Sequence, residues 1–120
     1  MNYEMTFEVT TRYTAKELGS GTLQVLGTPG LIAMVENVCM NAIEKDLEAG
    51  ATSVGSYIDI NHLKPSLMGA LINIVVSLDK SDGKIFNFSY KAYDGDTLIA
   101  TGNHSRVKVD VMSFMERLNK

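Results

Sequence analysis

The sequence predicts an α+β domain in which one antiparallel sheet of about five strands wraps around one long apolar helix. Residues 28–47 have the period of a helix but are apolar over most of its circumference, so the helix must be almost completely enclosed. Other segments alternate or are rich in β-branched residues, which is typical of strands. A chain of 120 residues is long enough for one hydrophobic core, so we expect residues 1–120 to form a single domain.

The composition excludes several classes of protein. A hydrophobic fraction of 45% and a charged fraction of 21% are ordinary for a globular protein, and a net charge of −3 provides no basic surface for nucleic acid. No apolar run reaches the ~18 residues needed to cross a bilayer, and the first residues lack the pattern of a signal peptide. The single cysteine, Cys39, cannot form an internal disulfide and suits a reducing compartment. We expect a soluble cytoplasmic protein without a nucleic-acid or membrane partner.

The N-terminal part of the chain is expected to form one strand and a long connection. Residues 7–13 alternate and contain several β-branched side chains, so they are predicted to be the first strand. Residues 14–27, which include Gly19-Ser20-Gly21, are expected to be irregular. A connection of this length is either a crossover that only has to reach the helix or a lid over a binding site.

The central helix is predicted to begin at Thr28, whose hydroxyl can cap the first N–H groups, with Pro29 at the first helical position. Gly50 is placed to end it. The polar residues fall on one narrow stripe: Asn37, Asn41, Glu44, Lys45 and Glu48. Glu36 lies about 100° from the centre of this stripe, among apolar neighbours. This carboxylate either reaches water or a basic partner, or it is half-buried and does acid–base or nucleophilic work.

Residues 52–62 are predicted to form the second strand, which ends before Pro65 because proline cannot continue a central strand. The alternation of the strand turns five residues toward the core, namely Val54, Ser56, Ile58, Ile60 and His62. Gly55 marks either a β-bulge or a place where another group approaches the backbone closely. His62 is either a structural histidine with satisfied hydrogen bonds or a functional one.

The C-terminal half is predicted to be an antiparallel meander of three strands joined by polar turns, at residues 69–78, 85–93 and 97–109. Phe86, Phe88 and Tyr90 are expected to share one face of their strand. Residues 111–118 form a short terminal helix or fray. A sheet of this kind leaves an open edge and a partly covered apolar face, for which dimerisation is the usual remedy.

Several short segments occur in an order that resembles a known family. They are residues 25–36, 52–56, 61–65, 94–95 and 102–106. Together they are similar to the hotdog-fold thioesterases of the fluoroacetyl-CoA thioesterase-like group, over most of the chain from the first strand to the fifth. The resemblance implies a hotdog fold and a homodimer, in some members a tetramer, with the active site between subunits.

Matched position by position, the resemblance implies that Thr28, Glu36 and His62 are the catalytic residues. A thioester carbonyl needs an activated nucleophile or water, a group that moves protons, and donors for the oxyanion, and these residue types can supply them. The start of a helix, where Thr28 lies, favours developing negative charge. The sequence leaves open whether Thr28 or Glu36 attacks directly or activates water.

The resemblance also implies binding residues. Gly55 matches the glycine whose strand lines the acyl pocket, and His104 is expected to support the structure. Lys64 and Arg106 are candidates for binding the phosphates of coenzyme A. The implied substrate is a short-chain or modified acyl-CoA, and no cofactor is implied. The acyl group stays open, because residues 14–27 do not align with the lid and pocket residues that select fluoroacetyl groups in the family.

Two other functions are compatible with the same fold. A hotdog module can bind an acyl-CoA without hydrolysing it, and the fold also supports hydratase or dehydratase chemistry on enoyl-CoA. Thr28, Glu36 and His62 together favour the hydrolase, because a pure binding module does not need an acid–base pair. Two histidines and one cysteine without close spacing give no reason to expect a metal site.

Overall fold

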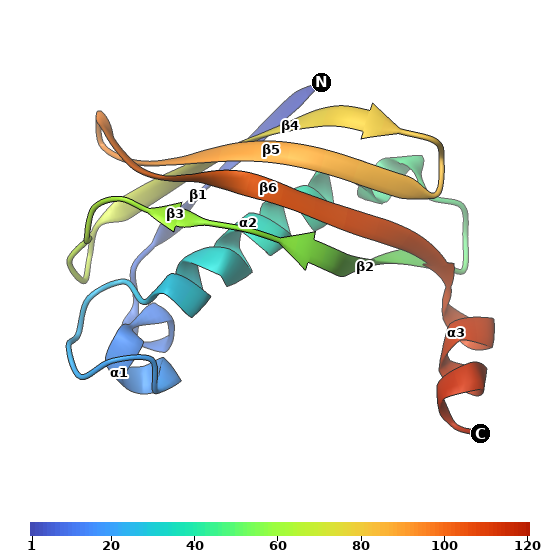
Figure 1. Cartoon of the computed structure of the whole chain (residues 1–120), viewed down its shortest axis with the longest axis horizontal. Helices are drawn as coiled ribbons and strands as arrows, with labels where there is room; N and C mark the ends of the chain where they lie inside the picture. The colour runs from blue at the N-terminus through green and yellow to red at the C-terminus, as the bar shows by residue number, and fades with distance from the viewer.

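A computed structural model describes residues 1–120 as one curled sheet around one helix (Figure 1). The strands are β1 (Asn2–Glu8), β2 (Ala51–Ile58), β3 (Asn61–His62), β4 (Leu71–Ser81), β5 (Ile85–Asp94) and β6 (Thr97–Asp110). The helices are α1 (Ala15–Leu18), α2 (Thr28–Ile43) and α3 (Val111–Leu118), with 3₁₀ turns η1 (Thr11–Tyr13) and η2 (Glu44–Asp46). All strand pairs are antiparallel, in the order β1-β4-β5-β6-β2, and β3 also pairs with β6. The predicted α+β fold is confirmed.

Helix α2 lies against the concave face of the sheet and carries much of the core. Its buried residues are Gly30, Leu31, Met34, Val35, Val38, Cys39, Ala42 and Ile43. They belong to one cluster with inward side chains of the sheet, among them Ile74 and Phe88. The helix changes to 3₁₀ geometry at Glu44, and Leu47 already has extended backbone, so Gly50 does not end it.

The start of α2 differs from the prediction in one respect. Gly27, with extended backbone, is the N-cap, and Thr28 is the first helical residue. The hydroxyl of Thr28 does not cap the helix because it is hydrogen-bonded to His62. Gly30 lets this first turn lie directly on the backbone of Tyr13, whose carbonyl oxygen would be 2.5 Å from a Cβ atom at position 30.

The first strand is displaced from its predicted position. β1 covers Asn2–Glu8 instead of residues 7–13, and it pairs with β4 along its whole length. Every second side chain from Met5 onward faces the core: Met5 and Phe7 pack against it, and Val9 is completely buried. This alternation fixes the position of the strand. Beyond Val9 the chain turns into η1, so the β-branched residues there belong to a turn and not to a strand.

The connection between β1 and α2 is ordered. The short helix α1 begins after Thr14, whose hydroxyl accepts a hydrogen bond from the N–H of Glu17 at 3.2 Å. Single β-bridges then join Thr14 to Leu26 and Val25 to Leu67. The first bridge closes the connection on itself, and the second joins it to the loop that follows β3.

The predicted second strand is divided and changes phase. A bulge lies between Gly55 and Tyr57, as Gly55 indicated. Before the bulge Ser53 and Gly55 face α2, so the prediction that Val54 and Ser56 face the core is wrong. After the bulge the inward residues are those predicted, Ile58, Ile60 and His62. The extra residue in the bulge reverses the alternation along the strand.

Strands β4, β5 and β6 form the predicted meander. Phe86, Phe88 and Tyr90 are buried together on its inner face. The chain then forms α3, which Asp110 caps by accepting a hydrogen bond from the N–H of Ser113. Figure 1 shows α3 extending away from the end of β6, beyond the sheet. No helix combines the length and the hydropathy needed to cross a bilayer.

Candidate active site

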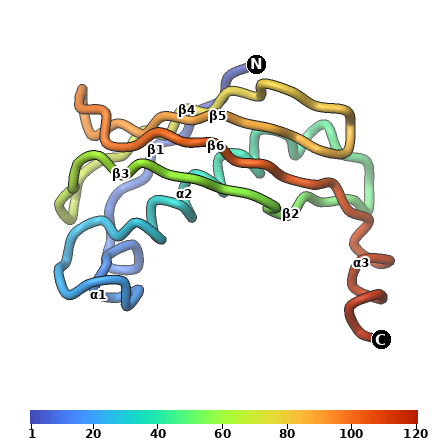
Figure 2. The backbone as a smooth tube through the Cα atoms, viewed as in Figure 1, coloured from blue at the N-terminus to red at the C-terminus, as the bar shows by residue number.

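Thr28 and His62 form a hydrogen-bonded pair at the start of α2. The distance from Thr28 Oγ1 to His62 Nδ1 is 2.8 Å. Figure 2 shows why they meet: after α2 the chain runs back along the sheet as β2, so that β3 returns to the level of the helix start. Residues that are 34 positions apart in the sequence are thereby placed side by side.

The imidazole of His62 is arranged to accept a proton. Partial burial lowers the pKa of His62 below its ordinary 6.5, an effect that the backbone of Lys64 partly offsets. The ring is therefore mainly neutral at pH 7. With its hydrogen on Nε2, it accepts the hydroxyl hydrogen of Thr28 at Nδ1. Nε2 lies buried on the other side of the ring.

The first turn of α2 adds unused N–H groups beside this pair. The hydrogen-bond ladder of the helix begins with the N–H of Leu31 donating to the carbonyl of Gly27 at 3.0 Å. Pro29 has no N–H, so the free donors of this turn belong to Thr28 and Gly30. Together with the positive end of the helix dipole, these groups favour an anion or a developing oxyanion next to Thr28.

Glu36 lies in a second cluster, beneath β2. It is half-buried, and a side chain at Gly55 would begin 2.7 Å from its Oε2 atom. The same point is 3.3 Å from His104 Cε1 and 3.8 Å from Arg106 Nη1. The missing side chain at Gly55 therefore provides the room that the carboxylate occupies. Glu36 forms no salt bridge within 4.0 Å, so its oxygens are not locked in a direct ion pair.

Arg106 is buried between β2 and β6, with 6% of the residue exposed. Its guanidinium donates to Ser53 Oγ at 2.8 Å and to the Ser53 carbonyl at 2.9 Å. Burial lowers the pKa of Arg106, and the nearby carboxylate of Glu36 acts in the opposite direction. This interior position gives no support to the predicted phosphate contact of Arg106. The exposed Lys64 keeps that prediction open.

His104 connects Arg106 to the backbone of β2. Its Nδ1–H donates to the carbonyl of Tyr57 at 2.7 Å, which leaves Nε2 to accept a hydrogen bond from Arg106 Nη1 at 3.2 Å. Burial lowers the pKa of His104, the hydrogen bond to Tyr57 raises it, and Arg106 lowers it further. The ring is therefore neutral in this network, consistent with the supporting role expected for it.

Ser53 is a member of this cluster that the sequence reasoning missed. The alternation of side chains between the two faces of β5 and β6 could have indicated its role. Phe86 and Phe88 face the core, and they pair across the sheet with Arg106 and His104. This pairing places a cation and an imidazole on the inner face, where they need a polar partner from the neighbouring strand β2.

The two clusters are separated within one chain. Thr28 and Glu36 are eight residues apart on α2, which corresponds to about 12 Å along a helix axis. The structure thus brings Thr28 to His62 and Glu36 to Gly55. It does not bring all three predicted catalytic residues to one point of a single chain.

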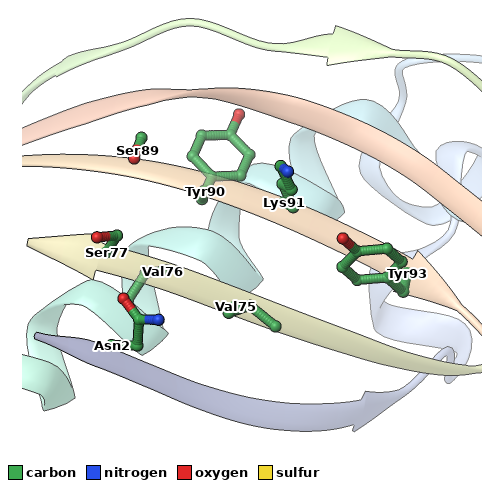
Figure 3. Close-up of a pocket in the computed structure, with 8 residues that line it drawn as sticks. All are labelled: Asn2, Val75, Val76, Ser77, Ser89, Tyr90, Lys91 and Tyr93. Carbon is green, nitrogen blue, oxygen red and sulfur yellow. The ribbon is translucent and has the colours of Figure 1, made fainter.

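A hollow of about 380 Å³ lies elsewhere, on the outer face of the sheet (Figure 3). Its lining comes from β1, β4 and β5 and comprises Asn2, Val75, Val76, Ser77, Ser89, Tyr90, Lys91 and Tyr93. Ser77, Ser89 and Lys91 alternate with side chains that point inward to the core, so they face away from α2. The hollow contains none of the candidate residues, and we do not assign it to the candidate site.

Comparison with known proteins gives a consistent result. Residues 9–112 match the family model described as fluoroacetyl-CoA-specific thioesterase. The chain is 24% identical over 97 residues to the fluoroacetyl-CoA thioesterase of Streptantibioticus cattleyicolor, a match that covers 81% of this chain and 70% of that protein.

Solved structures show the same fold. A structure of the fluoroacetyl-CoA thioesterase FlK has a TM-score of 0.94 at 22% identity, covering 99% of this chain and 93% of that one. A variant of FlK in complex with fluoroacetate and CoA has a TM-score of 0.91 at 22% identity, with 97% and 95% covered. A thioesterase superfamily member from Thermus thermophilus has a TM-score of 0.87 at 26% identity, with 99% and 90% covered. The likeness confirms the predicted hotdog fold.

Proposed function

The chain belongs to the fluoroacetyl-CoA-specific thioesterase family, and on this premise we propose that it hydrolyses a short-chain or modified acyl thioester of coenzyme A. The observation that carries the proposal is the 2.8 Å hydrogen bond from the Thr28 hydroxyl to the neutral imidazole of His62. It lies at a helix start with free N–H groups, and acyl transfer needs these groups together. Variants of FlK have been solved with fluoroacetate and CoA and with acetyl-CoA, which supports the substrate class.

We propose further that the working enzyme is a homodimer in which each site uses both subunits. β2 is the last strand of the sheet, and its outer edge has no partner within the chain. Pairing two such edges around a two-fold axis reverses one α2 helix relative to the other. The Thr28 end of one subunit then approaches Glu36 of the other. This arrangement removes the separation of about 12 Å between Thr28 and Glu36 in one chain.

In such a site the free N–H groups of α2 stabilise the oxyanion that forms when the thioester carbonyl is attacked. Glu36 either removes the proton of an attacking water or attacks the carbonyl carbon itself, which gives a mixed anhydride that water then hydrolyses. The hydrolytic water supplies the hydroxyl group of the acid product, and the neutral His62, hydrogen-bonded to Thr28, relays the proton that this water loses to the sulfur. The products are a carboxylic acid and the thiol of coenzyme A. We propose that the exposed Lys64, two residues beyond His62, contacts the phosphates.

The first test is the release of free thiol from a panel of acyl-CoA thioesters, with His62→Ala as the paired control. The panel contains acetyl-CoA, fluoroacetyl-CoA and longer or substituted acyl chains. We expect turnover of at least one member that is lost in the variant. Binding of the same thioesters, measured by calorimetry, without thiol release above the control would replace the hydrolase with a non-catalytic acyl-CoA binding module.

Subunit complementation tests the shared site. Glu36→Gln and His62→Ala are each expected to be inactive alone. A mixed dimer has one site that lacks both groups and one site in which both groups are intact. Random reassociation after reversible unfolding is therefore expected to restore about one quarter of the parent activity. Mass spectrometry shows whether the mixed dimer has formed. If it has formed and no activity is recovered, the three residues belong to a site within one subunit.

Gly55→Ala tests the close approach of Glu36 to β2. The new methyl group would begin 2.7 Å from Glu36 Oε2, so the carboxylate has to move. We expect kcat/KM to fall about 10- to 100-fold, because misplacing a reacting group by about 1 Å has an effect of this order. The midpoint of thermal unfolding is expected to change little, since the contact is with the end of a flexible side chain. Thiol release and calorimetry measure the two quantities.

Ser56→Ala is the control for Gly55→Ala, because it changes the next residue of β2 without adding bulk. Parent activity in Gly55→Ala would show that the carboxylate does not need its present position. Loss of folded protein would show that the glycine serves the strand itself and not the site.

A further inference from the structure

We propose that helix α3 docks between subunits: in the proposed homodimer, the apolar side of α3 packs against apolar loops beside His62 of the partner subunit. The proposal rests on the proposed dimer and adds a second contact to the pairing of the β2 edges. It assigns a role to two exposed apolar surfaces that the candidate active site leaves unexplained.

Helix α3 presents an apolar stripe that its own chain leaves uncovered. The stripe, which we call the α3 stripe, has helical spacing and consists of Val111 (41% exposed), Met112 (82%), Met115 (49%) and Leu118 (65%). The other side of the helix lines a groove against β2 and β6 with Ser113, Phe114 and Arg117. No residue of α3 is buried. An isolated helix of eight residues is not stable in water, so the α3 stripe needs a surface to pack against.

A second uncovered apolar surface lies at the other end of the molecule. It combines the connection before α2 with the loop after β3, which the bridge between Val25 and Leu67 joins. Its exposed side chains, which we call the loop patch, are Leu23 (66%), Leu63 (53%), Leu67 (73%) and Met68 (43%). Leu63 directly follows His62, so the loop patch borders the candidate active site. Single exposed apolar residues are normal, whereas a group of them marks an interaction surface.

The free edge of β2 relates the two surfaces. Asp110 at the end of β6 pairs with Ala51, the first residue of β2, so α3 begins beside the start of the edge strand. The loop patch follows the other end of β2, after β3. Figure 1 shows α3 and α1 extending past β2 at opposite ends of the sheet. Two-fold pairing of the β2 edges exchanges these ends, so α3 of each subunit meets the loop patch of the other.

The lengths of the facing segments agree with this pairing. The eight residues of α3 extend about 12 Å along the helix axis. In the partner subunit, the four residues from the end of β2 to His62 cover about 13 Å of extended chain. Helix α3 therefore reaches the segment that leads from the partner's edge strand to its active site.

The charges at the borders of the two surfaces are complementary. Glu116 follows Met115 at the border of the α3 stripe, and the exposed Lys16 and Lys64 belong to the two segments that carry the loop patch. None of these three charged side chains forms an ion pair within its own chain. Docking on a second copy brings the carboxylate toward the two ammonium groups.

Disulfide cross-linking between subunits tests the docking directly. Met115→Cys and Leu67→Cys are prepared separately, mixed, reassociated after reversible unfolding and oxidised. We expect a covalent dimer that contains up to about half of the chains, the share that random reassociation places in mixed dimers. Either variant alone is expected to stay uncrosslinked, because the two-fold axis places position 115 beside position 67 and not beside itself. The native Cys39 is buried and does not interfere.

The matched control replaces Met115→Cys by Arg117→Cys in the mixture. Position 117 faces the groove of its own chain, so we expect no cross-link to Leu67→Cys. Native mass spectrometry establishes that mixed dimers are present in both mixtures. Mixed dimers without a cross-link between positions 115 and 67 would overturn the proposal, as would a cross-link in Met115→Cys alone.

The dissociation constant of the dimer, measured by sedimentation, is the second readout. We expect Met115→Glu to raise it about tenfold or more, because docking would bury an unpaired carboxylate. Ser113→Glu introduces the same charge in the first turn of α3, where a helix favours an acid, and is expected to leave the constant unchanged. An unchanged constant in Met115→Glu would assign the α3 stripe to a different partner, such as a membrane or another protein.

Neither readout depends on turnover, so the two proposals can fail separately. A parent protein that forms the cross-link between positions 115 and 67 but releases no thiol would retain the docking and lose the proposed hydrolase. A parent that releases thiol without this cross-link would retain the hydrolase and lose the docking. A monomeric parent would remove both the docking and the shared site.

Discussion

Glu36→Gln is expected to lower kcat/KM about 10³-fold while the protein remains folded, a loss of about 4 kcal/mol of transition-state stabilisation. The amide has nearly the size of the carboxylate, so it fills the space beneath Gly55, but it can neither accept a proton nor attack a carbonyl carbon at neutral pH. The measurement is steady-state thiol release on the best thioester of the panel. Circular dichroism and gel filtration establish that the variant keeps its fold and its oligomeric state.

The matched control is Glu44→Gln, which removes an exposed carboxylate from the end of the same helix. It changes the net charge by the same amount and is expected to keep parent activity. A Glu36→Gln variant that hydrolyses the thioester at the parent rate would remove Glu36 from the mechanism. Its half-buried position would then be explained by the charge of Arg106 alone.

His62→Ala is expected to lower kcat/KM about 10²- to 10⁴-fold, the range over which positioned proton transfer contributes to catalysis. The change removes the acceptor of the Thr28 hydroxyl hydrogen and the group proposed to deliver a proton to the leaving sulfur. It also removes a partly buried ring that packs beside the start of α2. Asn61→Ala, at the neighbouring exposed position of β3, is the control for the effect of truncation in this strand.

The pH dependence gives a second check on His62. Burial lowers its pKa below the ordinary 6.5, so the ring in the folded protein loses its proton at a lower pH than a free histidine does. Activity that needs the neutral ring is therefore complete at pH 7 and falls as the pH drops through this lowered pKa. The residual activity of His62→Ala is expected to lack this step. A parent rate that rises on acidification would show that the protonated ring is the active form.

The elements that the sequence predicts well are those with a single, long period. The apolar circumference of residues 28–47 leaves no arrangement except enclosure, and the structure surrounds α2 with the sheet. Phe86, Phe88 and Tyr90 likewise must share one face of a strand, because each lies two residues from the next, and all three are buried. Such patterns predict both the type of an element and the face that it buries.

The elements that were misplaced depend on partners far away in the sequence. Residues 7–13 have the composition of a strand, but the position of β1 is decided by its pairing with β4, more than sixty residues later. Thr28 has the chemistry of an N-cap, but the competing partner of its hydroxyl is His62, which only the return of β3 brings into reach. Both partners, β4 and His62, are too far away in the sequence for the residues around β1 or Thr28 to indicate them.

The candidate site shows the same division. The resemblance to a family identified Thr28 and His62 as members of one site, and the structure places them in contact. Arg106 was a candidate for binding the phosphates of coenzyme A, yet cross-strand pairing with Phe86 places it on the buried inner face. In the proposed dimer Glu36 joins the other two residues through a second copy of the chain, and no pattern within one sequence specifies such a pairing.

The bulge after Gly55 has a consequence for how this protein can change during evolution. Ser53 and Gly55, which border Glu36, follow one alternation phase, and His62 follows the opposite phase after the extra residue. A deletion of one residue between positions 55 and 61 would make the alternation regular and turn His62 away from Thr28, although neither residue would have been altered. If the proposed site is correct, selection on the length of this segment is expected to be as strong as on the proposed catalytic side chains, and homologues are expected to tolerate substitutions there far more readily than insertions or deletions.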